Sequence, residues 1–136
     1  MGSYLNPGGG LFRTCRRSKI YVDKSNLITK TNEVLGTEQR FVCVSRPRRF
    51  GKSMAANMLA AYYGRDENAE NLFVDLKISA DPDFRTHLNQ YDVIRINVQE
   101  FLSASESMDE MLSMLQKRLL HELKSQYPDY IDGDYL

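Results

Sequence analysis

The stretch "FVCVSRPRRFGKSMAANMLAAYY", residues 41–63, decides how the whole sequence is interpreted. It opens on "FVCVS", a nearly continuous apolar run of strand length, as expected for a strand buried on both faces of a parallel sheet. A short polar loop follows, and the apolar residues then recur at helical spacing as far as Gly64. A buried strand, a short loop and an amphipathic helix, in that order, are the context in which a phosphate-binding loop is expected.

The end of this loop has the residues that phosphate binding requires. Gly51, Lys52 and Ser53 complete the pattern G-x-x-x-x-G-K-[ST] at the predicted start of the helix. The first backbone N–H groups of a helix have no intrahelical partner and carry the positive end of its dipole, so they favour an anion. Lys52 would neutralise phosphate charge, also in a transition state, and the Ser53 hydroxyl would be one ligand of Mg²⁺.

The beginning of the loop departs from the pattern. Arg46 stands where the first glycine is expected, and Pro47 after it biases Arg46 toward extended backbone and supplies no N–H group. Arg48 and Arg49 add two cations that can reach phosphate oxygens. The alternative for this arginine pair is a solvated or RNA-facing basic turn.

These residues carry a resemblance to a known family. "YVDKSNLI", followed by "VSRPRRFGKSM", resembles the AAA-ATPase-like family of bacteria, whose loop is typically S-R-P-R-R-F-G-K-[ST]. The resemblance covers residues 21–101 and implies that Arg46 belongs to a variant loop that binds ATP with Mg²⁺. Tyr21 to Lys24 belong to the motif too. Asp23 as a helix cap and Tyr21 as a packing residue remain as open as contact with the base. The implied nucleotide-binding residues are Arg46, Pro47, Arg48, Arg49, Phe50, Gly51, Lys52 and Ser53.

Hydrolysis needs a second, acidic strand that holds Mg²⁺ and positions water. The one strand expected after the loop is "VIRINVQE", which Arg95 and Asn97 interrupt and which ends at Glu100. By the resemblance, the acidic strand and a C-terminal nuclease-like domain would lie beyond Leu136. The chain is therefore expected to be the N-terminal fragment of an ATPase that binds ATP without hydrolysing it alone, and whether it is an enzyme stays undecided.

The predicted fold class is α/β, as a partial P-loop NTPase core. It comprises a central parallel strand, the P-loop, a helix, a second strand at 93–100 and a long helix from Ser107, truncated before the acidic Walker B strand. A shorter helix with Asp23 or Ser25 as N-cap and Gly36 as its stop precedes the loop. Residues 1–18 are expected to be a flexible lead, 19–127 the ATPase part and 128–136 an acidic tail. Unpaired strand edges would favour self-association.

The charge distribution suggests partners. Residues 1–53 carry 11 Lys/Arg against 3 Asp/Glu, and residues 54–136 carry 7 against 15. A basic half attracts phosphate, so a nucleic-acid-binding module that uses Arg13, Arg16, Arg17 and the loop arginines is one alternative, and an inactive remnant is another. The sequence has no apolar run of membrane-spanning length and no secretory signal, so no membrane partner and a cytoplasmic location are expected.

Overall fold

The computed structural model describes residues 4–44, 52–65 and 69–128, which form two compact units. The larger unit is residues 8–93, and the smaller combines residues 1–7 with 94–136.

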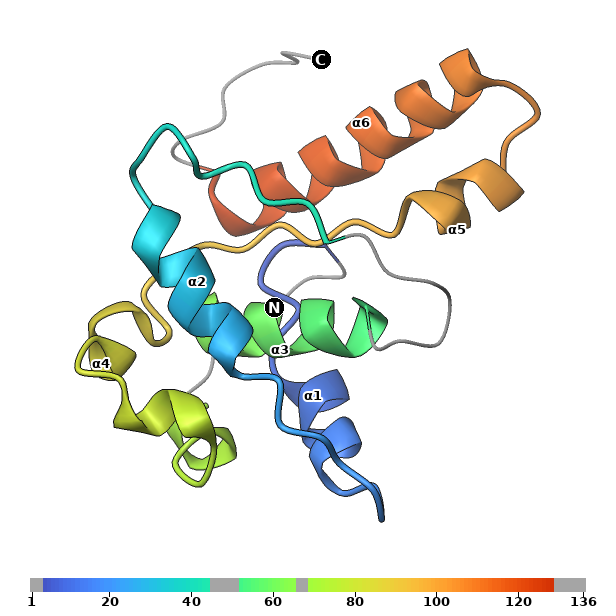
Figure 1. Cartoon of the computed structure of the whole chain (residues 1–136). Coiled ribbons are helices and arrows are strands. Elements are labelled where there is room, and N and C mark those ends of the chain that lie inside the picture. The colour runs from blue at the N-terminus through green and yellow to red at the C-terminus, as the bar shows by residue number, and fades with distance from the viewer. Residues whose placement is uncertain (1–3, 45–51, 66–68, 129–136) are drawn as a thin grey trace. The chain divides into compact units, whose positions relative to one another are not determined.

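The larger unit is built from helices (Figure 1). They are α1 (Gly10–Arg16), α2 (Asn26–Val34), α3 (Lys52–Tyr63), α4 (Phe84–His87) and the 3₁₀ helices η1 (Glu70–Leu72) and η2 (Lys77–Ala80). Aromatic rings form the centre of its core. The Phe12 ring stacks on that of Phe73 at a centroid distance of 5.0 Å, and Tyr62 meets Phe73 edge to face at 5.5 Å. All three side chains are buried, so they supply much of the apolar area that stabilises the unit.

Residues 1–18, expected to be a flexible lead, include α1, and Phe12 fixes this helix in the core. The sequence offered no clear periodicity over these seven residues. Their helix is stabilised by packing against α3 instead of by intrinsic propensity.

The smaller unit contains two helices, α5 (Val98–Ser103) and α6 (Met108–Gln126), which pack together. Helix α6 begins as the sequence predicts, because the Ser107 hydroxyl accepts a hydrogen bond from the Glu110 N–H at 3.1 Å. The N-terminal segment of the chain joins them: the Glu122 carboxylate accepts hydrogen bonds from the N–H groups of Tyr4 (2.9 Å) and Leu5 (3.0 Å). The fully buried Phe101 ring lies 5.6 Å from that of Tyr4.

The predicted α/β core is wrong for the described residues, which are mainly helical and contain no strand or sheet. Their only β-type pairings are the isolated bridges Leu5–Ile94 and Gly64–Tyr91. Residues 41–44, the described part of the expected central strand, form no backbone hydrogen bond with another described residue, and Phe41 is 82% exposed. The expected second strand at 93–100 makes one bridge, at Ile94, and its last three residues belong to α5, which begins at Val98.

The physical reason is that a strand is completed by a neighbour. An apolar run predicts that a segment is buried. Its N–H and C=O groups also need a partner strand, and the run itself does not specify which strand that is. The helices satisfy their own backbone groups, so α2, α3 and α6 form where the sequence predicts them. Within the described ranges, no helix is long and apolar enough to cross a membrane.

Candidate functional site

The helix predicted to follow the phosphate loop is α3, and Lys52 is its first residue. Ser53 lies exposed in its first turn. The rest of the predicted loop, Arg46, Pro47, Arg48, Arg49, Phe50 and Gly51, falls outside the described residues. The first N–H groups of a helix have no partner within the helix and carry the positive end of its dipole, which together suit a phosphate group.

The opposite end of α3 is held by Asn89, a residue that the sequence analysis did not single out. The Asn89 amide nitrogen donates to the carbonyl oxygens of Ala61 (3.0 Å) and Gly64 (2.5 Å), and its oxygen accepts from the Ala69 N–H (2.9 Å). The Asn89 backbone N–H donates to the Tyr62 carbonyl at 2.6 Å. Asn89 adopts φ +55°, a left-handed conformation that asparagine tolerates better than most residues. This side chain therefore satisfies carbonyl groups that the helix end would leave unpaired.

The last turn of α3 is tied to α2 by phenol groups. The Tyr63 hydroxyl donates to Asn32 Oδ1 at 2.5 Å and lies 2.6 Å from Thr31 Oγ1. The Tyr62 hydroxyl donates to the Phe84 carbonyl at 2.6 Å and accepts from Asn32 Nδ2 at 3.3 Å. Burial raises the pKa of Tyr63 to about 12, so the phenol stays protonated as a donor. The last turn of α3 is thus held both by Asn89 and by α2.

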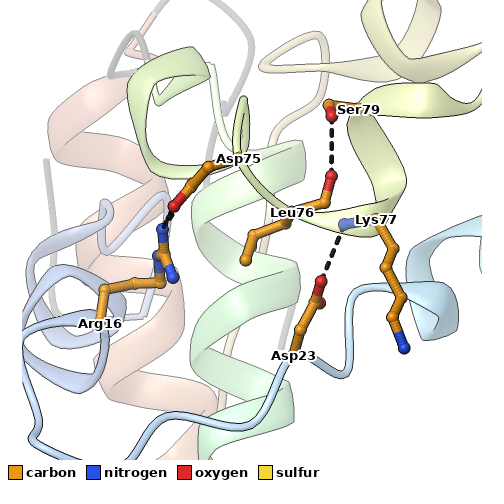
Figure 2. Close-up of polar contacts among 6 residues, drawn as sticks. All are labelled: Arg16, Asp23, Asp75, Leu76, Lys77 and Ser79. Carbon is orange, nitrogen blue, oxygen red and sulfur yellow. Dashed lines mark hydrogen bonds and ion pairs between the residues drawn. The ribbon is translucent and has the colours of Figure 1, made fainter.

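Asp23 has a structural role (Figure 2). Its Oδ1 accepts from the Ser25 N–H and its Oδ2 from the Lys77 N–H, both at 2.8 Å. Ser25 is buried, and its hydroxyl accepts from the Ile78 N–H at 3.1 Å. Partial burial acts to raise the pKa of Asp23, but the hydrogen bonds from Ser25 and Lys77 outweigh it and lower the pKa below its ordinary value. Asp23 and Ser25 therefore clamp the start of α2 to η2.

Tyr21 and Arg16 lie beside this clamp. The Arg16 guanidinium donates to both oxygens of Asp75, as Figure 2 shows in part, and stacks over the Tyr21 ring at 4.8 Å. Tyr21 meets the Phe12 ring edge to face at 6.2 Å. The packing role considered for Tyr21 is therefore present, and Arg16, considered for nucleic-acid binding, is engaged within its own unit.

The helix that carries Ser53 has one further polar feature. Asn57, one turn beyond Ser53, has a buried side-chain oxygen without a hydrogen-bond partner among the described residues. A search of those residues finds no group of three or more His, Cys, Asp or Glu side chains that could hold a metal ion. The Ser53 hydroxyl as a ligand of Mg²⁺ stays a prediction.

One family model matches most of the chain. The model for the family described as predicted AAA-ATPase matches residues 11–135, so the chain belongs to the AAA-ATPase-like family, as the resemblance implied. The comparison with curated proteins gives no match, and neither does that with solved structures.

Proposed function

We propose that this chain binds ATP with Mg²⁺ through the variant loop at residues 46–53 and does not hydrolyse ATP on its own. The observation that carries the proposal is the start of α3 at Lys52, because it sets the helix N-terminus at the G-K-S tripeptide of a family member. The N–H groups of this first turn would donate to the phosphate oxygens.

The roles within the loop follow from their chemistry. Lys52 would supply a cation to the phosphates, and in a complete ATPase it would also stabilise the charge of the transition state. Arg48 and Arg49 would add charge-assisted donors. The Ser53 hydroxyl would be a ligand of Mg²⁺, which neutralises phosphate charge when it is bound. Because α3 packs against α1 and its last turn is held by Asn89 and α2, the helix would already be formed before the nucleotide arrives, which lowers the entropic cost of binding.

The second half of the proposal, that the chain does not hydrolyse ATP on its own, rests on the position of Glu100. Glu100, the residue at the end of the apolar segment, lies in the first turn of α5. A Walker B acid follows a buried strand, and Glu100 instead occupies an exposed helical position. It therefore lacks the setting in which a carboxylate holds Mg²⁺ beside the phosphates and orients water.

The test is calorimetric titration of the full chain with Mg²⁺–ATP, beside Lys52→Ala and the control Lys30→Ala. Lys30 is an exposed lysine on α2 of the same unit, so its replacement changes net charge equally without touching α3. We expect Lys52→Ala to weaken binding at least about tenfold and Lys30→Ala to leave it within about twofold. Equal affinity of the wild type and Lys52→Ala would refute loop binding.

Two further measurements separate binding from catalysis. Ser53→Ala should reduce the gain in affinity that Mg²⁺ gives to ATP, while binding of metal-free ATP changes little. Phosphate release by the wild-type chain should equal that of Lys52→Ala. Release that Lys52→Ala abolishes would show that the chain hydrolyses ATP and would overturn the non-hydrolytic half of the proposal.

A further inference from the structure

The α1–α2 segment, residues 17–25, extends away from the helices of its own unit (Figure 1). It carries two aliphatic side chains that lie in solvent. Ile20 is 84% exposed, more than any other large apolar side chain of the described residues, and Val22 is 62% exposed. Aliphatic surface in water is unfavourable, so two such side chains in one protruding segment indicate a binding surface.

The side chains of this segment alternate between its own unit and solvent. The Tyr21 ring lies edge to face against Phe12, and the Asp23 carboxylate accepts a hydrogen bond from the Lys77 N–H. Successive side chains of an extended segment point to opposite sides, so Ile20 and Val22 lie together on the side that faces away from the unit. The contacts of Tyr21 and Asp23 therefore hold both aliphatic side chains outward.

Cations lie next to these aliphatic side chains in the chain. Residues 13–24 contain five Lys or Arg residues and one acidic residue, Asp23. Arg17 and Lys19 precede Ile20, Lys24 follows Val22, and all three cations are exposed. Their side chains are long enough to turn the charge toward a surface that the neighbouring aliphatic residues enter.

Two acidic side chains lie near the segment, and both are bonded within the unit. Asp23 accepts hydrogen bonds from the N–H groups of Ser25 and Lys77, and Asp75 accepts hydrogen bonds from the Arg16 guanidinium. Their charges are therefore partly compensated where they are, and the α1–α2 segment keeps a net positive charge that favours an anionic partner.

We propose that the α1–α2 segment binds the surface of an anionic lipid bilayer. Ile20 and Val22 enter the region between the headgroups and the acyl chains, where aliphatic side chains leave water. Arg17, Lys19 and Lys24 contact the anionic headgroups, and each cation close to such a surface strengthens binding about fivefold.

The combination of cations with exposed aliphatic side chains favours a bilayer over a nucleic acid. Nucleic acids are bound by stacking of bases on aromatic rings and by hydrogen bonds, which Ile20 and Val22 do not provide. The one aromatic residue of the segment, Tyr21, packs within the unit. A protein partner would need an acid-rimmed pocket of fitting shape, whereas a bilayer presents anionic headgroups and acyl chains to any protruding segment.

The sequence predicted no membrane partner, because it has no apolar run of spanning length. A contact at the bilayer surface needs no such run, and it does not depend on ATP binding.

Co-sedimentation of the full chain with lipid vesicles tests the charge of the surface. We expect the chain to bind vesicles that contain about 30% phosphatidylserine at least about tenfold more tightly than vesicles of phosphatidylcholine alone, and salt should weaken this binding. Lys19→Glu should weaken it at least about tenfold, because an anion replaces a cation. The matched control is Lys30→Glu, an equal change at an exposed lysine on α2, which should stay within about twofold.

Replacement of Ile20 tests the apolar contribution. Ile20→Ser should weaken binding to the anionic vesicles about tenfold, because serine lacks the aliphatic area that leaves water. The matched control is Leu102→Ser on α5, since Leu102 is 49% exposed and lies outside the segment. Circular dichroism verifies that all variants keep their helix content.

Fluorescence locates the contact, because the chain contains no tryptophan. The emission of Ile20→Trp should shift to shorter wavelength on anionic vesicles and be quenched by lipids brominated in their acyl chains, while that of Leu102→Trp stays unchanged.

Three results would overturn the proposal. They are a wild type that does not sediment with anionic vesicles, binding that is equal after Ile20→Ser and Leu102→Ser, and an Ile20→Trp emission that vesicles do not shift. Binding of a single-stranded oligonucleotide that Lys19→Glu abolishes, in a chain that does not bind vesicles, would assign the segment to nucleic acid instead.

Discussion

Asn89 offers the sharpest test of how the larger unit holds α3. Replacement by alanine removes the three side-chain hydrogen bonds to Ala61, Gly64 and Ala69. At about 1 kcal/mol net for each bond, this loss amounts to about 3 kcal/mol. The φ of +55° adds about 1 kcal/mol, because alanine adopts the left-handed region less readily than asparagine. We therefore expect Asn89→Ala to lower the free energy of unfolding by about 4 kcal/mol, a large part of the stability of a small unit.

A second substitution at Asn89 separates the loss of the hydrogen bonds from the backbone strain, and a neighbouring residue provides the control. Asn89→Gly loses the same hydrogen bonds without the backbone strain, so its loss should be about 1 kcal/mol smaller than that of Asn89→Ala. Gln90→Ala is the control, because the exposed Gln90 side chain has no hydrogen bond to a described residue other than the one to the Leu88 carbonyl, two residues before it. Its effect should stay within about 0.5 kcal/mol.

The assay is urea unfolding followed by far-ultraviolet circular dichroism, with the slopes compared so that the midpoints report stability. A loss below about 1 kcal/mol for Asn89→Ala would refute the assignment of Asn89 as the anchor of α3. A loss for Asn89→Gly that equals or exceeds that of Asn89→Ala would instead refute the contribution of backbone strain.

Three further outcomes follow from individual side chains. Because the pKa of Asp23 is lowered in the folded chain, its carboxylate contributes stability above the ordinary carboxyl pKa, and this stability is lost as pH falls through the folded value. Asp23→Asn should therefore be less stable than the wild type at neutral pH, and its stability should depend less on pH below about pH 4. Urea midpoints of the two proteins that run parallel across the acid range would contradict this. Because the pKa of Tyr63 is raised to about 12 in the folded chain, its protonated phenol contributes stability below the ordinary phenol pKa, and this stability is lost as pH rises toward 12. The stability of Tyr63→Phe should therefore fall less than that of the wild type as pH rises, which circular dichroism recorded against pH will measure. Asn57→Ala should raise the free energy of unfolding by about 1 kcal/mol in thermal or urea unfolding, because it removes a buried oxygen that no described residue pairs and improves helix propensity. A destabilised Asn57→Ala would instead mean that this oxygen has a partner in the native chain.

The sequence alone predicted where the helices α3 and α6 begin. The G-K-S tripeptide and the apolar spacing after it located the start of α3, and Ser107 followed by an apolar stripe located α6. These signals lie within one or two turns of chain, so a single sequence contains them. The anchors of α3 were not predictable in this way. The Asn89 side chain donates hydrogen bonds to carbonyl groups 25 and 28 residues earlier in the chain. An isolated asparagine between leucine and glutamine belongs to no sequence pattern that predicts such bonds.

What the sequence by itself determined is the family, the position of the proposed phosphate loop and the helices α2, α3 and α6, because helices form bonds between residues close in the chain. The tertiary structure alone decided the role of the motif at residues 21–24, where the Asp23 clamp reaches Lys77 across 54 residues of sequence. It also decided that residues 41–44 form no sheet with the described chain. Strand pairing and side-chain clamps join distant residues, and their partners are specified only when the chain has brought them together.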